Sequence, residues 1–329
     1  GFPGGDRRAA GAAARPARPG DGTGVTGRIG IAAVPAVLAV LLGLPLLLGG
    51  GYVLHVFSVT YIFVVLAVGL DLVMGFAGQF SFAQGAFYGI GAYTAAILHR
   101  DFGTGFWLHL PAGMLVAGGF GLLLALPALR LSGHFLAIVT IAFQTIVYLI
   151  LLQWTSFTGG PYGIMVPPAS GFASTESFYY LALGVAAATL LLAWALAGSR
   201  LGREWQSLRD DELLARAIGL NTTRAKLAAF VAAAALAGAA GVLIAHDVQG
   251  VSPDDFSIAT SAAVIAMVLV GGRGTLVGPV LGAAFFTAMP EALRFTADYR
   301  LIIYGSLMIV MIVAMPEGVV GTMLRRWRA

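Results

Sequence analysis

Long apolar runs separated by short polar segments dominate the chain from residue 29 onward. A helix needs roughly 20 apolar residues to cross about 30 Å of hydrocarbon. Ten segments approach that length: approximately 29–49, 52–74, 81–98, 107–127, 134–153, 178–198, 227–245, 258–272, 277–293 and 301–315. Gly and Pro interrupt several of them, so 258–293 is either two short crossings or one re-entrant pair. The pattern predicts an all-α polytopic membrane protein with about ten transmembrane helices, in a range of eight to ten.

Composition agrees with the hydropathy pattern. Hydrophobic residues make up 59% of the chain and charged residues 10%, with a mean hydropathy of +0.89. A soluble domain carries roughly 25% charged residues. The net charge of +4 comes from Arg residues scattered between apolar spans, which form no basic stripe of the kind that binds nucleic acid. Cysteine is absent, which excludes disulfides and thiol chemistry.

The positions of the basic residues predict the orientation, because Lys and Arg concentrate in cytoplasmic loops. With the N-terminus inside, sixteen of the 19 Lys and Arg residues fall in cytoplasmic segments, and Arg100, Arg294 and Arg300 fall outside. We therefore expect both termini and the segment 199–226 in the cytoplasm. The loops 154–177 and 246–257 are expected on the outer face.

The ends of the chain differ from the apolar middle. Residues 1–28 are rich in Gly, Ala, Pro and Arg and cannot bury enough apolar surface to fold, so they are predicted to form a disordered basic tail. The run 29–49 is longer than a 7–15-residue signal core, which favours a retained first helix. The predicted domains are this tail, a transmembrane domain at 29–320 and a basic cytoplasmic tail at 321–329.

Segment 199–226 is a charged island that holds ten of the chain's 34 Asp, Glu, Lys and Arg residues. Asp211 and Glu212 place acids in the first turn of a predicted helix, and Arg216 follows Glu212 by four residues. Both features stabilise a helix, and Gly219 is a typical stop. We predict a cytoplasmic helix at about 204–219. It either presents a surface to a partner or is a solvated helix without one.

Two Gly-interrupted regions, 75–93 and 271–282, lie in different halves of the chain. Paired broken helices favour a translocation site, because their freed backbone groups can line a cavity. The alternative is that these glycines only form tight turns. The predicted translocation path consists of Asp71, Gln79, Ser81, Gln84, Tyr93, Gly271, Gly272 and Gly274.

Most of these groups are neutral, which suits a small neutral or zwitterionic solute. Asp71 is the exception, and a charge inside the membrane costs at least about 2.5–3.5 kcal/mol. Its carboxyl either binds the ammonium of a zwitterion or packs in a protonated, hydrogen-bonded form.

Small residues recur at four-residue spacing in several spans. Such spacing lets helix backbones approach closely in lipid. The sets are Gly85 with Gly89, Gly113 with Ala117 and Gly121, and Ala234 with Gly238. They predict helix packing and carry no function by themselves.

Motifs for chemistry are missing from the sequence. It contains no GxxxxGK[ST] phosphate loop, no HExxH metal motif and no GxSxG nucleophile turn. We therefore expect no catalytic residue, no bound cofactor and no metal site in this chain, and any ATP hydrolysis must occur in other subunits.

Four stretches carry a family resemblance. They begin with GLDLVMGFAGQFSFAQGAFYGIGAYTAAIL at 69–98 and continue, in order, at 134–164, 207–245 and 270–291. They resemble bacterial branched-chain amino acid ABC transporter permeases over most of the chain from about 60 to 320. The order of four long stretches is more specific than any single motif.

The resemblance implies the all-helical permease of an importer in the bacterial inner membrane. It also implies a second permease subunit, usually a paralogue, two ATPase subunits that bind ATP and Mg, and a periplasmic solute-binding protein. A short cytoplasmic helix of such permeases docks in a cleft of the ATPase, and Glu212 and Gly219 match its positions, one residue further apart than in the general importer pattern. With their neighbours they give the expected coupling set: Arg209, Asp211, Glu212, Arg216 and Gly219. Many relatives carry Asn where this chain has Asp71.

The expected cargo is a branched-chain or other hydrophobic amino acid. Urea or a short amide is the alternative within the same importer class, since urea permeases share the architecture. An ion-coupled secondary transporter or channel is the alternative outside it. That third hypothesis leaves the charged island unexplained.

Overall fold

The computed structural model describes residues 51–128 and 134–292, together with 43, 45, 305–306 and 318–322. The chain divides into two compact units, Gly1–Gly49 and Gly50–Ala329, and the fold below is that of the second unit. Nearly all of the predicted spans 29–49 and 301–315 lies outside the described residues. The tail 1–28 and residues 323–329 lie outside them as well.

Eight predicted spans are helical in the structure. The helices are α2 (Gly51–Asp71), which continues as the π-helix η1 (Leu72–Phe76), α3 (Gln84–Phe102), α4 (Phe106–Ala128), α5 (His134–Gln153), α7 (Thr175–Gly198), α10 (Thr222–Asp247), α11 (Ile258–Gly271) and α12 (Val277–Ala292). Within the described part, five helices are long and apolar enough to cross a membrane, those at Gly51–Phe76, Phe106–Pro127, Phe135–Gln153, Thr175–Gly198 and Thr222–Asp247. The total of ten remains a prediction.

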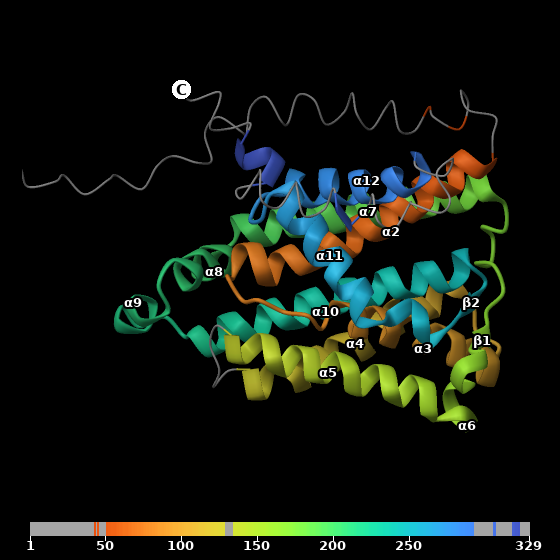
Figure 1. Ribbon diagram of the computed structural model, residues 1–329, viewed down its shortest axis with the longest axis horizontal. Helices are drawn as coiled ribbons and strands as arrows, with labels where there is room; N and C mark the ends of the chain where they lie inside the picture. The colour runs from red at the N-terminus through yellow and green to blue at the C-terminus, as the bar shows by residue number, and fades with distance from the viewer. Residues whose placement is uncertain are drawn as a thin grey trace, which may run out of the picture. The chain divides into compact units, whose positions relative to one another are not determined.

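Helices α2 and α10 form the interior of the bundle. Helix α10 packs against α4, α3 and α2, while α2 also packs against α7 and α12 (Figure 1). In the most apolar stretch of each helix, 67% of the residues of α2 and of α10 are buried, whereas 28% of those of α5 are buried. A helix that is apolar on all sides is stable only when protein or lipid surrounds it. Of the five long described helices, α5 therefore offers the most surface to lipid or another subunit.

Close contact between α4 and α10 depends on the small residues that the sequence spacing singled out. A Cβ added to Gly238 would lie 2.5 Å from the Gly113 carbonyl oxygen and 2.7 Å from the Ala117 Cβ. A Cβ on Gly121 would lie 2.5 Å from the Ala234 Cβ. The predicted close approach of helix backbones is confirmed here.

Short elements occupy the two ends of the bundle. Helices α8 (Arg200–Asp210) and α9 (Glu212–Ala217) lie at one end, and α6 (Thr155–Thr158) with two short strands lies at the other (Figure 1). Strands β1 (Ile164–Met165) and β2 (Gly250–Val251) pair antiparallel, with Ile164 opposite Val251. The 3-10 helices η2 (Gly160–Tyr162) and η3 (Pro253–Phe256) flank these strands. The sequence analysis predicted no strand, and this pairing joins the two loops expected on the outer face.

Candidate coupling and translocation site

Helix α8 is fixed to the bundle by one buried aromatic residue. Ser199 caps the helix by accepting a hydrogen bond from the Gly202 amide. Trp205 has no exposed surface, and its Nε1 donates to the Ala225 carbonyl at 2.8 Å. Buried Trp N–H groups need such a partner. The bond holds α8 against the first turn of α10.

The sequence predicted a single helix at 204–219. That prediction was wrong, since the segment forms two helices that meet at Asp211. Asp211 has an extended backbone with φ −160° and ψ 112°. Its Oδ1 accepts hydrogen bonds from the Leu213 and Leu214 amides at 2.8 and 3.0 Å. An aspartate that caps a following helix competes with continuation of the preceding one. The predicted stop is correct, since Gly219 adopts φ 86° directly after α9.

Glu212 is paired within its own chain. Its carboxylate lies 2.5 Å from Arg216 Nη2 and 2.8 Å from Lys226 Nζ. The Lys226 side chain is only 3% exposed. Arg216 also donates from Nε to the Thr222 hydroxyl at 3.2 Å. Glu212 and Arg216 therefore hold α9 on the start of α10, and their contact with an ATPase stays a prediction.

Apolar residues that the sequence analysis missed cover the outer face of α9. Leu213, Leu214 and Ile218 are 78%, 60% and 65% exposed. Clustered exposed apolar side chains on an otherwise charged segment are typical of a protein-binding surface. The signal was present in the sequence, as three apolar residues within the charged island. We call these three residues the α9 apolar face.

Asp71 lies where two predicted regions meet. It is 2% exposed, and its Oδ1 accepts a hydrogen bond of 2.8 Å from the Gly274 amide. Its Oδ2 has no hydrogen-bonding partner among the described residues. Arg209 of α8 donates from Nη1 to the Gly75 carbonyl at 3.1 Å. A member of the predicted coupling set thus contacts the broken helix that carries the predicted path.

The other polar residues near the first break bond to nearby backbone. Gln84 donates from Nε2 to the Leu66 carbonyl at 3.0 Å, and Gln79 donates to the Ala77 carbonyl at 3.2 Å. Ser81 accepts from the Ala83 amide at 3.3 Å. All three are buried. Gln79 and Ser81 bond to backbone groups of the non-helical linker 77–83, and Gln84 bonds α3 to α2. Each thus has the partner that buried polar groups require.

Gly271, Gly272 and Gly274 form the turn between α11 and α12. Gly272 and Gly274 have φ of 118° and 72°, a region that only glycine occupies at little cost. Gly271 packs directly on the backbone of Gly278. These contacts support the tight-turn interpretation of the second Gly-rich region.

Tyr93 lies apart from this cluster, on α3. Its ring packs against Phe256 with centroids 6.0 Å apart, and its hydroxyl has no partner among the described residues. Two neighbouring polar residues, Gln144 and Ser261, were missed. The Gly85 amide donates to Ser261 Oγ at 2.8 Å, and Gln144 Nε2 donates to the Phe256 carbonyl at 2.6 Å. The sequence did contain a signal for Gln144, since a Gln inside an apolar span is a buried polar residue that needs a partner.

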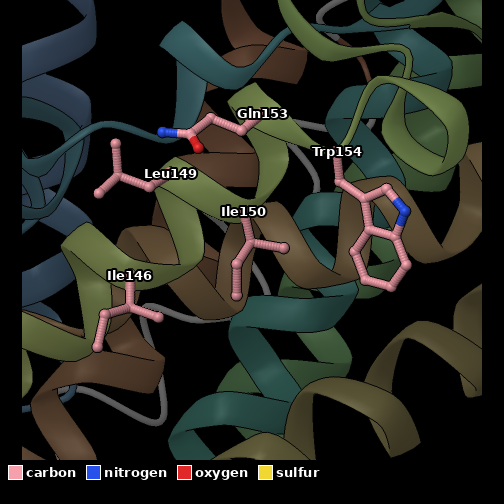
Figure 2. A pocket seen from close by; sticks show the side chains of 5 residues that line it. All are labelled: Ile146, Leu149, Ile150, Gln153 and Trp154. Carbon is pink, nitrogen blue, oxygen red and sulfur yellow. The ribbon is translucent and has the colours of Figure 1, made fainter.

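A hollow on the surface of α5 carries no feature of a solute site. Its lining comes from one helix and the residue after it: Ile146, Leu149, Ile150, Gln153 and Trp154 (Figure 2). Solute sites normally combine convergent polar groups from several elements. The described residues also contain no group of three or more side chains that could hold a metal ion.

Comparisons with known proteins identify the family. The model of the family described as "branched-chain amino acid transport system / permease component" matches residues 52–312. The high-affinity branched-chain amino acid transport system permease protein LivM of Salmonella typhimurium is 37% identical over 289 residues, which cover 79% of this chain and 68% of that protein. LivM of Escherichia coli matches to the same extent.

A second permease is also similar. LivH of Escherichia coli is 27% identical over 286 residues, covering 79% of this chain and 91% of that protein. No solved structure matches significantly. The family match covers most of the chain and includes every helix from α2 to α12. The chain therefore belongs to the family of permease components of branched-chain amino acid transport systems.

Proposed function

We propose that this chain is the transmembrane permease subunit of an ATP-driven, binding-protein-dependent importer of branched-chain or other hydrophobic amino acids. The family match over residues 52–312, with 37% identity to LivM, carries this proposal. Members of the family are transport subunits of the inner membrane, and the apolar helices of this chain agree with that location. The chain then moves its solute without a covalent step.

The proposed partners follow from the same match. Two ATPase subunits bind ATP and Mg, and one of them docks on α8 and α9. The α9 apolar face supports this choice, since it is exposed beside charged residues. Both LivM and LivH are similar to this chain, which favours a paralogous permease as the second membrane subunit. A solute-binding protein delivers cargo at the opposite end, and both termini lie in the cytoplasm.

The proposed cycle is alternating access by rigid-body movement. ATP binding draws the two ATPases together, and their movement pulls on α8 and α9 of each permease. The bundles then rock between inward- and outward-facing states around the broken helices. The solute passes between the two permeases.

Affinity purification from the native membrane tests the assembly. The informative variant combines Leu213→Asp with Leu214→Asp, because both side chains are exposed and their replacement leaves the packed residues of α9 in place. Glu212→Arg is less informative, since it would also leave Lys226 unpaired. We expect ATPase subunits to co-purify with the wild type and to be lost from the double variant. The matched control is Tyr162→Asp with Met165→Asp, two exposed residues at the opposite end of the bundle.

Reconstitution of the purified complex with its binding protein tests the cargo. We expect ATP-dependent leucine uptake that isoleucine and valine inhibit and urea does not. ATP-dependent urea uptake would assign the amide alternative instead. Uptake by the chain alone, without ATP, would replace the importer with a secondary transporter.

A further inference from the structure

Three segments that are distant in sequence meet at the cytoplasmic side of the bundle. They are the end of α2 with η1, the end of α8, and the turn between α11 and α12. Asp71 bonds to Gly274 across 203 positions, and Arg209 bonds to Gly75 across 134 positions. We call these four residues, Asp71, Gly75, Arg209 and Gly274, the clasp.

The clasp is packed at backbone distance. A Cβ on Gly274 would lie 2.9 Å from Arg209 Nη1 and 3.0 Å from the Gly75 oxygen. A Cβ on Gly78, just beyond η1, would lie 3.0 Å from the Arg209 Cα. Packing this close leaves no room for α8 to slide over the junctions unchanged. Movement of α8 must therefore displace η1 and the α11–α12 turn or break the two bonds.

Arg209 links the exposed side of α8 to a buried junction. Its Nη1 donates to the Gly75 carbonyl, and its Nε lies 3.5 Å from Asp210 Oδ1. Gly75 in turn packs against the Asp71–Gly274 bond, because a Cβ on Gly75 would lie 1.9 Å from Asp71 Oδ1 and 2.3 Å from the Gly274 nitrogen. Contiguous hydrogen bonds and close packing of this kind can carry coupling between sites.

Arg209 also lies next to the proposed ATPase surface. It precedes Glu212, the first residue of α9, by three positions. The α9 apolar face follows Arg209 along the chain after a short backbone stretch, and Arg209 contacts Gly75 and lies beside Gly274. Movement of α9 is therefore passed through the backbone to the first Gly break and to the tight turn between α11 and α12.

We propose that Arg209 and Asp71 are positioning residues for coupled transport, and that the clasp transmits movement of α8 and α9 to the two broken-helix junctions. The proposal rests on the proposed function as an ATP-driven importer. It assigns no solute contact to Asp71, in contrast to the sequence-based hypothesis of an ammonium site.

The test uses the complete complex with its ATPases and binding protein in proteoliposomes. ATP hydrolysis and leucine uptake are measured together for the wild type, Arg209→Ala, Arg209→Lys and Arg203→Ala. Arg203 is the matched control, because it lies on the same helix and its side chain donates to the Gly198 carbonyl beside that helix. We expect Arg209→Ala to lower the solute moved per ATP about tenfold, within the range typical of coupling between sites.

ATPase co-purification is measured for the same variants. Because the Arg209 side chain donates to the Gly75 carbonyl of η1, the proposal removes it from the docking set that the sequence predicted, and we expect the ATPases to stay bound to Arg209→Ala. Arg209→Lys should restore most of the coupling, because an ammonium can donate to the Gly75 carbonyl. Loss of co-purification in Arg209→Ala would overturn the proposal, since Arg209 would then belong to the docking surface. Equal losses in Arg203→Ala would overturn it as well.

Asp71 provides the second arm. Asp71→Asn keeps an acceptor for the Gly274 amide, whereas Asp71→Leu removes it. We expect Asp71→Asn to retain coupling and Asp71→Leu to lose it. The double variant, Asp71→Leu with Arg209→Ala, should be no worse than either single variant, because the effects of residues in one network are not additive. Fully additive losses would contradict a shared clasp. A wild-type complex that lacks an ATPase would instead refute the proposed function, before any variant is compared.

Discussion

The α4–α10 interface and the α8–α9 segment are held together mainly by different means. In the interface, Gly113, Ala117 and Gly238 bring backbones into contact, and one polar pair, His109 with His246, bonds near its end. In the α8–α9 segment, caps stabilise the short helices, and one indole hydrogen bond and a partly buried ion pair connect them to α10. The same helix, α10, takes part in both.

The difference follows from the solvent of each region. In lipid, apolar side chains gain nothing by leaving the hydrocarbon, so helices associate through close packing and polar contacts. At the aqueous end, water competes for every polar group, and a short helix needs caps and charged pairs to persist. Stability in the first region is therefore sensitive to volume, and in the second it is sensitive to hydrogen bonds and charge.

The largest expected effect is steric. Gly238→Leu places a side chain where a Cβ alone would lie 2.5 Å from the Gly113 oxygen. Overpacking against backbone should destabilise the bundle by about 3 kcal/mol or more. The yield of monodisperse protein and its thermal unfolding in detergent measure this. Gly119→Leu is the control, since nothing lies within 4 Å of a Cβ there, and equal damage from both would show that close packing is not the cause.

The second effect is electrostatic. Lys226→Met leaves Glu212 with Arg216 as its remaining partner. Because Glu212 is partly exposed, we expect a cost of about 2 kcal/mol, below the 3–5 kcal/mol for breaking a fully buried pair. Proteolysis within 212–219 should accelerate, and adding Glu212→Leu should recover part of the loss. Arg224→Met, an exposed change in the same turn of α10, should leave the cleavage rate unaltered.

A smaller effect concerns the anchoring of α8. Trp205→Phe keeps an aromatic ring in the buried site but removes the donor to the Ala225 carbonyl. The Ala225 carbonyl lies within α10, where the helix supplies a second donor, so the variant loses one buried hydrogen bond. Such a bond contributes about 0.5–1.5 kcal/mol, and we expect about 1.5 kcal/mol here. Hydrogen exchange should quicken in 200–210 while α4 stays protected. Unchanged exchange in α8 would mean that ring packing alone holds the helix.

The smallest expected effect is at the cap of α9. Asp211→Ala removes the acceptor for the Leu213 and Leu214 amides and should cost about 1 kcal/mol. Asp211→Asn retains an acceptor and should cost much less. Exchange of these two amides measures both variants. Circular dichroism measures whether the helix content of Asp211→Ala rises. A rise would show that α8 and α9 have become one continuous helix, and that capping by Asp211 causes the break.

Much of this fold was predictable because its signals are local. Apolar length predicted the five helices that are long enough to cross a membrane, since each must span the same hydrocarbon thickness. Gly219 was correctly predicted as a stop. Four-residue spacing identified both sides of the α4–α10 contact before the pairing was known. The break at Asp211 was not predicted, because a capping aspartate and a helical aspartate look alike in sequence.

The sequence by itself determined the membrane environment, the helices and the charged island between α7 and α10, since composition and periodicity express solvent and secondary structure directly. Only the tertiary structure decided which polar groups meet. It paired Glu212 with Lys226, exposed the α9 apolar face, and brought Asp71 to Gly274 and Arg209 to Gly75. Contacts between residues more than a hundred positions apart depend on how whole helices pack, and no local pattern encodes that arrangement.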